Sequence, residues 1–123
     1  MGSNINPEEN VKLAEKHVSE CTHLIKISQF YLTKPEEFLN QSDFLNGAFL
    51  VATWWDHEIL KSELKRIEAK QGRHKTPNKA GPRCIDLDIL VWNDVIIDEH
   101  LYQWSFLRKI VLELMPTLEF KNK

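Results

Sequence analysis

The segment from Gly81 to Ile89 reads Gly-Pro-Arg-Cys-Ile-Asp-Leu-Asp-Ile and is the most informative stretch of the sequence. A Gly-Pro turn followed by alternating apolar and acidic residues predicts a strand that leaves a rigid loop. Alternate residues of a strand share a face, so Asp86 and Asp88 should project together, with Cα atoms roughly 7 Å apart. Carboxylates at that separation can hold one or two Mg²⁺ ions, and the Arg83 guanidinium suits a phosphate. The segment therefore predicts a metal–polyphosphate site.

A second interpretation of the two acids stays open. Charges can alternate along a strand simply because one face of the sheet is solvated. A bare pair of acids is a weak signal by itself. Leu90 and Trp92 continue the face of Asp86 and Asp88, however, and this argues against a fully solvated face.

The preceding segment, from Arg73 to Arg83, concentrates positive charge in a chain whose net charge is −2. It contains no acid, and its basic side chains are Arg73, His74, Lys75, Lys79 and Arg83. Its glycine and prolines predict a long loop. Such a loop is a candidate anion-binding segment, because long loops inside small domains are often functional. An ordinary solvated loop has the same composition.

Composition places the chain among ordinary globular domains. With 123 residues, 42% hydrophobic and 28% charged, it should form a single domain over residues 1–123. The near-neutral charge gives no basic stripe, so no nucleic-acid partner is expected. There is no apolar run long enough to cross a membrane and no signal peptide, so we expect no membrane partner and a cytoplasmic location. The two cysteines and five histidines show neither disulfide nor zinc spacing.

Periodicity predicts alternating helices and strands. A helix should run from Pro7 to about Cys21, and a second helix, capped by Asp56, should end near Gly72. Strands are expected at 24–32, 44–54, 85–92 and 95–97, and a final helix at 105–114. This order predicts an α+β, ferredoxin-like βαββαβ sandwich with an antiparallel sheet, whose first strand is apparently absent.

These residues resemble those of the 6-hydroxymethyl-7,8-dihydropterin pyrophosphokinases, a folate-pathway family with a ferredoxin-like fold. The matching pieces follow one another at the family's spacings, from Gly2 to Ile97. They are Gly2-Ser3-Asn4, Tyr31-Leu32-Thr33 with Pro35, Asp43-Phe44-Leu45-Asn46, Ile67-Glu68, Gly72-Arg73, and Gly81-Pro82-Arg83 with Ile85-Asp86-Leu87-Asp88. The combination of Gly-Arg, a loop and Gly-Pro-Arg-x-x-Asp-x-Asp is highly specific.

The resemblance implies a reaction and its participants. The family transfers diphosphate from ATP to the hydroxymethyl group of the pterin and releases AMP, with two Mg²⁺ ions that Asp86 and Asp88 would hold. Both substrates are small molecules, and a monomer or a homodimer is expected. The residues implied to bind the nucleotide are Glu68, Arg73, Lys75 and Arg83, of which Arg73 and Arg83 also count as catalytic, together with Asp86 and Asp88. The residues implied to bind the pterin are Thr33, Phe44 and Asn46.

Other interpretations of the single residues remain. Phe44 fits a core position, Asn46 fits a turn, and Glu68 fits the solvated side of its helix. The chain also departs from the family pattern, because Ala80 stands where the family usually has tryptophan and residues 102–105 lack the family's Pro-His pair. A degenerate relative with little or no turnover, or an interaction domain on the same scaffold, is therefore an alternative to an active enzyme.

Overall fold

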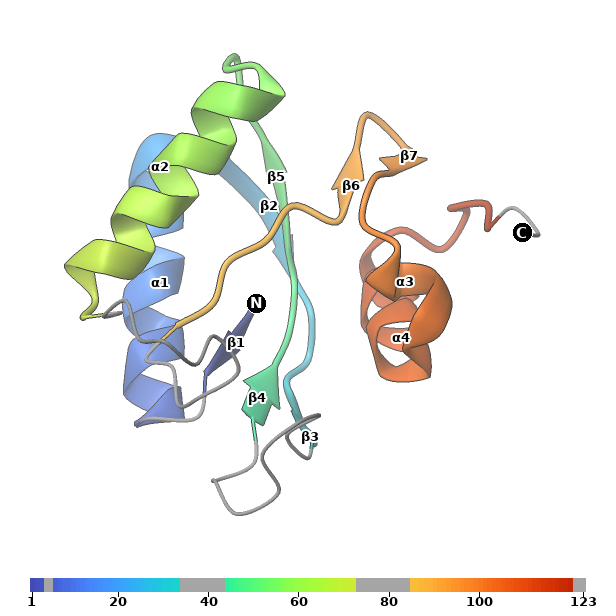
Figure 1. The fold of residues 1–123 in the computed structure, drawn as a ribbon, viewed down its shortest axis with the longest axis horizontal. Helices are drawn as coiled ribbons and strands as arrows, with labels where there is room; N and C mark the ends of the chain where they lie inside the picture. The colour runs from blue at the N-terminus through green and yellow to red at the C-terminus, as the bar shows by residue number, and fades with distance from the viewer. Residues whose placement is uncertain (4–5, 34–43, 73–84, 121–123) are drawn as a thin grey trace.

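The computed structural model describes residues 1–3, 6–33, 44–72 and 85–120. Its elements in order are β1 (Gly2–Ser3), α1 (Pro7–Cys21), β2 (His23–Ile27), β3 (Tyr31–Thr33), β4 (Phe44–Asn46), β5 (Phe49–Ala52), α2 (His57–Lys70), β6 (Val91–Trp92), β7 (Val95–Ile96), α3 (His100–Gln103) and α4 (Ser105–Leu114). The fold is mixed α+β with antiparallel pairing between its strands. Figure 1 shows α1 and α2 on one side of the strands, with α3 and α4 on the other.

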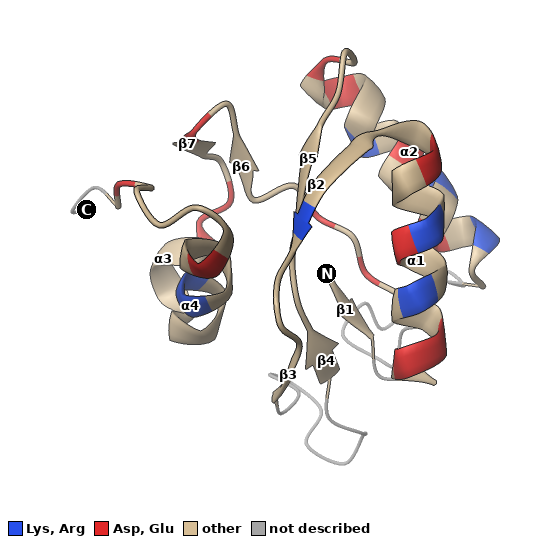
Figure 2. Ribbon diagram, turned by 180° about the vertical axis from the view of Figure 1, so that it is seen from behind, with Lys and Arg blue, Asp and Glu red and all other residues tan. Residues whose placement is uncertain are grey.

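The three long helices confirm the sequence predictions. Helix α1 starts at Pro7 after Asn6, which has a φ of 41° and makes no side-chain capping hydrogen bond. Helix α2 is capped by Asp56, whose carboxylate accepts a 2.9 Å hydrogen bond from the Ile59 N–H. Acidic and basic residues are interleaved along both helices (Figure 2). The short helix α3 was not predicted, because a single turn carries too little periodicity to detect.

The main core lies between α1, α2 and the segment that begins at Ile85. Its buried members are Val11, Ala14, Val18, Leu60, Leu64, Ile67, Ile85 and Leu87. Full burial of each large aliphatic side chain contributes about 1.5–3 kcal/mol. Leu101, Ile110, Val111 and Leu114 are also buried, where α3 and α4 meet. In the part of the chain that the structure describes, no helix is both long and apolar enough to span a bilayer.

The strands predicted at 24–32 and 44–54 are each divided in two. Strands β2 and β5 pair with each other, and β3 and β4 pair with each other. The interruption falls at 28–30 in the first predicted strand and at 47–48 in the second, which lie opposite each other. Within the interruption, Ser28 N donates to Ala48 O at 3.0 Å, and Ser28 Oγ accepts from Ala48 N at 2.8 Å. A side-chain hydroxyl thus replaces one backbone partner of the ladder, which interrupts both strands.

The expectation that the first strand is absent is wrong. Gly2 and Ser3 form β1, whose Gly2 lies opposite Asn46 of β4. The other edge of Gly2 forms an antiparallel bridge with Asp86, in which Gly2 N donates to Asp86 O at 3.0 Å and Asp86 N donates to Gly2 O at 2.8 Å. One short strand therefore joins the β3–β4 pair to the segment that carries the two aspartates.

The strand predicted at 85–92 is confirmed only at its end. Residues Val91–Trp92 form β6, which pairs with β7 across a turn at Asn93 and Asp94. These two residues have φ values of 47° and 65°, as a tight two-residue hairpin requires. Within residues 85–90, only Asp86 forms a β-bridge. The side-chain contacts of Leu87, described below, explain why the strand does not continue.

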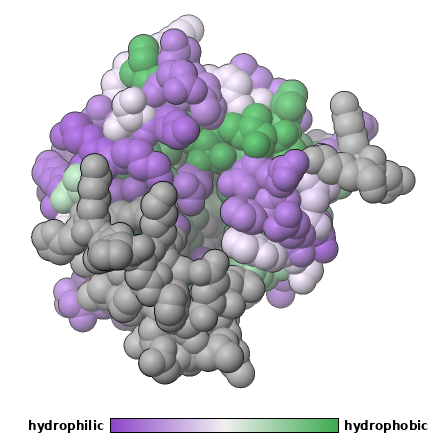
Figure 3. Space-filling view, in the orientation of Figure 1, coloured by the Kyte–Doolittle hydropathy of each residue, from purple (hydrophilic) through white to green (hydrophobic). Residues whose placement is uncertain are grey.

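A mainly apolar cavity of about 420 Å³ lies beyond β1, between β5 and the segment at 87–94. Met1 and, from α4, Val111 and Leu114 contribute to its lining. On the surface, apolar side chains gather over the β6–β7 hairpin (Figure 3), where Val95 is 61% exposed. An apolar cavity therefore lies next to the residue that precedes β1.

Candidate active site

Strands β3 and β4 bring Thr33, Phe44 and Asn46 together. Thr33 lies opposite Phe44, and Asn46 follows two residues later on the same face of the strand. The Asn46 side-chain amide donates to Thr33 Oγ1, and it also lies 3.4 Å from Phe44 O. All three side chains are half-buried. The arrangement offers amide and hydroxyl groups beside an aromatic ring, which suits a flat polar heterocycle.

Gly2 connects this group to the aspartates. A Cβ on Gly2 would lie 2.8 Å from Asn46 Oδ1, so the missing side chain leaves the room that the amide occupies. The same glycine forms the bridge to Asp86. Asp86 is half-buried, whereas the Asp88 side chain is 51% exposed. The polar face of β4 and the aspartate pair are thus separated by one residue of β1.

Helix α2 binds the residue between the two aspartates. The Glu68 carboxylate accepts a 2.6 Å hydrogen bond from Leu87 N, and the Lys65 ammonium lies 3.2 Å from Leu87 O. Both backbone polar groups of Leu87 therefore bind side chains, so Leu87 does not extend a ladder. Glu68 is only 3% exposed. The alternative interpretation, which put Glu68 on the solvated side of its helix, is therefore wrong.

Lys65 is a site residue that the sequence reasoning missed. Its ammonium nitrogen lies 3.3 Å from Glu68 Oε2 and 3.4 Å from Asp88 Oδ1. The i,i+3 spacing from Glu68 is a local signal for an ion pair on a helix. The contact with Asp88 has no local signal, because it joins residues 23 positions apart.

The site carries negative charge. Burial lowers the pKa of the Met1 α-amino group, whereas the nearby carboxylates of Asp86, Asp88 and Glu68 act to raise it. The amino group donates a 2.9 Å hydrogen bond to Gly47 O. The three carboxylates contribute negative potential at this point, and the Lys65 ammonium beside Glu68 and Asp88 offsets part of it.

The donor set fits a magnesium ion that arrives with its substrate. In the described ranges, no group of three His, Cys, Asp or Glu side chains is placed to hold a metal. Asp86 and Asp88 nevertheless supply two hard oxygen donors. Mg²⁺ is usually bound by one or two carboxylates and completes its coordination with water and substrate phosphates. The residues present therefore suit a metal–polyphosphate complex.

A cavity of about 300 Å³ opens beside Asp88. Helix α2 lines one wall with His57, Lys61 and Lys65, and Asp98 and Glu99 belong to the lining before α3. Its volume lies at the lower end of the range for small-molecule sites. The basic side chains on the α2 wall suit a ligand that carries a negatively charged group, such as a phosphate, near the aspartates.

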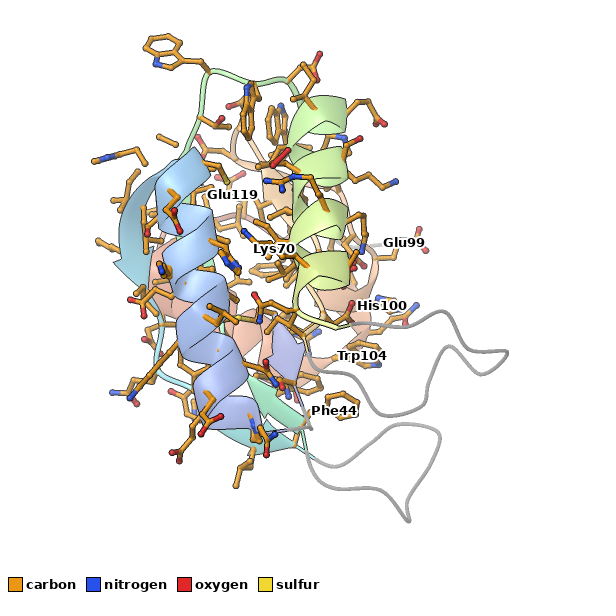
Figure 4. All side chains as sticks on the ribbon, turned by 90° about the vertical axis from the view of Figure 1, so that its left-hand side faces the viewer. Phe44, Lys70, Glu99, His100, Trp104 and Glu119 are labelled. Atoms are coloured by element: carbon orange, nitrogen blue, oxygen red, sulfur yellow. The ribbon has the colours of Figure 1, made fainter. Side chains whose placement is uncertain are left out.

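The side chains of Phe44, His100 and Trp104 appear on the same side of the molecule in the view of Figure 4. The rings of His100 and Trp104 stack with centroids 4.1 Å apart. Arg73, Lys75 and Arg83, which the sequence assigns to the phosphates, lie outside the described residues. Their roles stay predictions.

The chain is similar in sequence to several known proteins. The chain matches the family described as 7,8-dihydro-6-hydroxymethylpterin-pyrophosphokinase over residues 1–116. It is 39% identical to the 2-amino-4-hydroxy-6-hydroxymethyldihydropteridine pyrophosphokinase of Haemophilus influenzae, over 82% of this chain and 65% of that protein. It is 34% identical to the protein of the same name from Aquifex aeolicus, over 98% of this chain and 77% of that protein. It is 33% identical to the folic acid synthesis protein fol1 of Schizosaccharomyces pombe, over 95% of this chain and 17% of that protein. The chain thus spans less than two thirds of the Haemophilus and Schizosaccharomyces proteins.

Proposed function

The chain belongs to the 7,8-dihydro-6-hydroxymethylpterin-pyrophosphokinase family, and from this premise we propose that it is an active, ATP-dependent pyrophosphokinase of folate biosynthesis. It transfers the terminal diphosphate of ATP to the hydroxymethyl group of 6-hydroxymethyl-7,8-dihydropterin. The observation that carries the proposal is the double pairing of Gly2. Because Gly2 pairs with Asn46 and with Asp86, it holds a surface for the acceptor beside carboxylates for the metal.

The acceptor side is formed by β3 and β4. Asn46 and Thr33 hydrogen-bond to the polar edge of the pterin, and the ring of Phe44 packs against its face. The hydrogen bond between Asn46 and Thr33 fixes both side chains before the substrate arrives. Such preorganisation reduces the entropy lost when the pterin binds.

The donor side is formed by α2 and the aspartates. Asp86 and Asp88 would hold two Mg²⁺ ions, and the bound ions would neutralise the phosphate chain and orient the acceptor hydroxyl. The nucleotide occupies the cavity beside Asp88, and Arg73, Lys75 and Arg83 bind its phosphates. Glu68 lies next to the nucleotide site and holds Leu87 between the aspartates.

The reaction is a substitution at the β-phosphorus of ATP. The hydroxymethyl oxygen of the pterin forms the new P–O bond, and the bond between the β-phosphorus and the α–β bridging oxygen breaks. AMP leaves with that oxygen, and the hydroxyl proton passes to solvent. The residues contribute mainly by position and charge, as is general for phosphoryl-type transfer.

We place this chemistry on a ferredoxin-like βαββαβ sandwich formed by a single domain. The position of β1, between β4 and the Asp86 segment, and the packing of α1 and α2 on one side of the strands support this arrangement. A cytoplasmic location and a monomeric or homodimeric state fit an enzyme that acts on small metabolites.

The direct test is to incubate the protein with ATP, Mg²⁺ and 6-hydroxymethyl-7,8-dihydropterin and to follow AMP and the pterin diphosphate by mass spectrometry. We expect both products in equal amounts, and neither with Asp88→Ala. A folded protein that binds the pterin but forms no AMP would support the alternative of a degenerate relative.

A further inference from the structure

We propose that Lys65 is a positioning residue that holds Asp88 in the metal-free protein and gives it up when the metal–nucleotide complex binds. The inference rests on the proposed function, because it concerns the same site. It assigns Lys65 two opposite effects: it opposes the binding of a bare divalent cation, and it favours the binding of a cation that brings phosphates.

The contacts of the Lys65 ammonium show that it holds Asp88. Its nitrogen lies 3.3 Å from Glu68 Oε2, 3.2 Å from Leu87 O and 3.4 Å from Asp88 Oδ1. A protonated lysine has three N–H donors, and three oxygens surround it here. The ammonium thus stands at the carboxylate that the metal would use.

The three contacts are not equivalent. Glu68 is 3% exposed and also accepts the Leu87 N–H, so its pairing with Lys65 belongs to the interior. The Asp88 side chain is 51% exposed, and its contact with Lys65 is the longest of the three. Exposed ion pairs are weak, whereas removing the partner of a buried charge is costly. Asp88 can therefore leave Lys65 while Glu68 and Leu87 keep it in place.

The adjoining cavity offers a place where a polyphosphate could meet Lys65. Lys65 lines the cavity beside Asp88 and, like Lys61, reaches it from α2. An ammonium at this position repels a dication on Asp88, which weakens metal binding without nucleotide. A polyphosphate in the cavity supplies negative charge that the released ammonium can bind. The same residue then stabilises the ternary complex, so the site favours metal and nucleotide together.

The test compares two titrations of the full chain: Mn²⁺ alone, followed by electron paramagnetic resonance of the free ion, and α,β-methylene-ATP with Mg²⁺, followed by calorimetry. For Lys65→Met we expect about fivefold tighter Mn²⁺ binding and about fivefold weaker nucleotide binding, the upper range for a partly exposed charge pair. Lys65→Arg keeps the charge and should shift each affinity less than twofold. Lys70→Met removes an exposed charge from the last turn of α2 and should change neither.

Unchanged or weaker Mn²⁺ binding by Lys65→Met would overturn the proposal, as would Mn²⁺ binding that is undetectable in both proteins. If Lys65→Met does not fold, Lys65→Gln retains a donor for Leu87 O without the charge, and the same opposite shifts are expected. Neither titration depends on turnover. An inactive protein with both shifts keeps the inference and loses the proposed function, whereas an active protein without them loses only the inference.

Discussion

Glu68 accepts a 2.6 Å hydrogen bond from the backbone N–H of Leu87, the residue that separates Asp86 from Asp88. The carboxylate is buried, so the bond is shielded from competing water. It joins α2 to the aspartate segment across 19 positions of the sequence. The separation between the aspartates is set by the backbone, and their position relative to the rest of the site is set by this helix.

Replacing Glu68 should therefore cost stability. Glu68→Ala leaves the Leu87 N–H without its acceptor and Lys65 without its buried partner, so we expect a loss of about 2–4 kcal/mol in the free energy of unfolding. Glu68→Gln retains a carbonyl acceptor and should lose less. Urea denaturation measures both, and equal losses would show that the charge, rather than the hydrogen bond, matters.

The aspartates should behave differently. Asp88→Ala removes a half-exposed side chain, so we expect the free energy of unfolding to change by less than about 0.5 kcal/mol. Magnesium-dependent binding of α,β-methylene-ATP, measured by calorimetry, should be lost, and Asp86→Ala should lose it too. Glu20→Ala, which removes an exposed carboxylate from α1 that does not line this cavity, is the control and should change neither stability nor binding. Unchanged binding by Asp88→Ala would remove its metal role.

Replacing Gly2 with alanine should lower both stability and pterin binding, and a double variant should distinguish the two effects. The new methyl group would meet Asn46 Oδ1 at 2.8 Å and displace the amide, at a cost of about 1–3 kcal/mol. We expect weaker pterin binding, measured by quenching of the pterin fluorescence. The double variant Gly2→Ala with Asn46→Ala removes the obstacle, so it should recover stability but not pterin binding. Independent, additive losses of stability would contradict this explanation.

The thiol of Cys21 should be slow to react. Its burial, followed by the charge of Glu63, raises its pKa, so the folded state disfavours the thiolate. The linked stability is present at neutral pH and is lost as the pH rises through the raised pKa. In a Cys84→Ser background, alkylation at pH 8 should be slower in the folded protein than in urea. Equal rates would mean that Cys21 is freely accessible.

The cavity beyond β1 should accept added strand residues. About five apolar residues joined to Met1 would continue β1 between β5 and the segment at 87–94, at about 3.3 Å per residue. They would also replace a buried amino group with an amide, so we expect the melting temperature to rise by several degrees. The matched control is an extension of alternating Gly and Ser, which should not raise it.

Sequence alone predicted what depends on local pattern. Strand spacing predicts that Asp86 and Asp88 share a face, which stays a prediction, whereas helices α1, α2 and α4 follow from apolar periodicity and caps. The breaks in the strands do not, because they depend on tertiary partners: the Ser28 hydroxyl binds Ala48 across the sheet, and α2 side chains bind Leu87. Lys65 was missed for the same reason. On the helix it reads as one more exposed charge, and only the packing of α2 against the aspartate segment brings it to Asp88.

The double pairing of Gly2 has a consequence for the distance between the proposed pterin site and the proposed metal site. Neighbouring strands lie about 4.8 Å apart, so Asn46 and Asp86 stand on either side of Gly2 at one strand spacing each. The backbone of the sheet thus sets the distance between the residues proposed to bind the pterin and the aspartates proposed to bind the metal. Side chains can adjust their contacts by small amounts, whereas the spacing between two hydrogen-bonded strands is nearly constant. The distance between the two proposed sites is therefore a property of the fold. Any variant that keeps these two pairings keeps that distance.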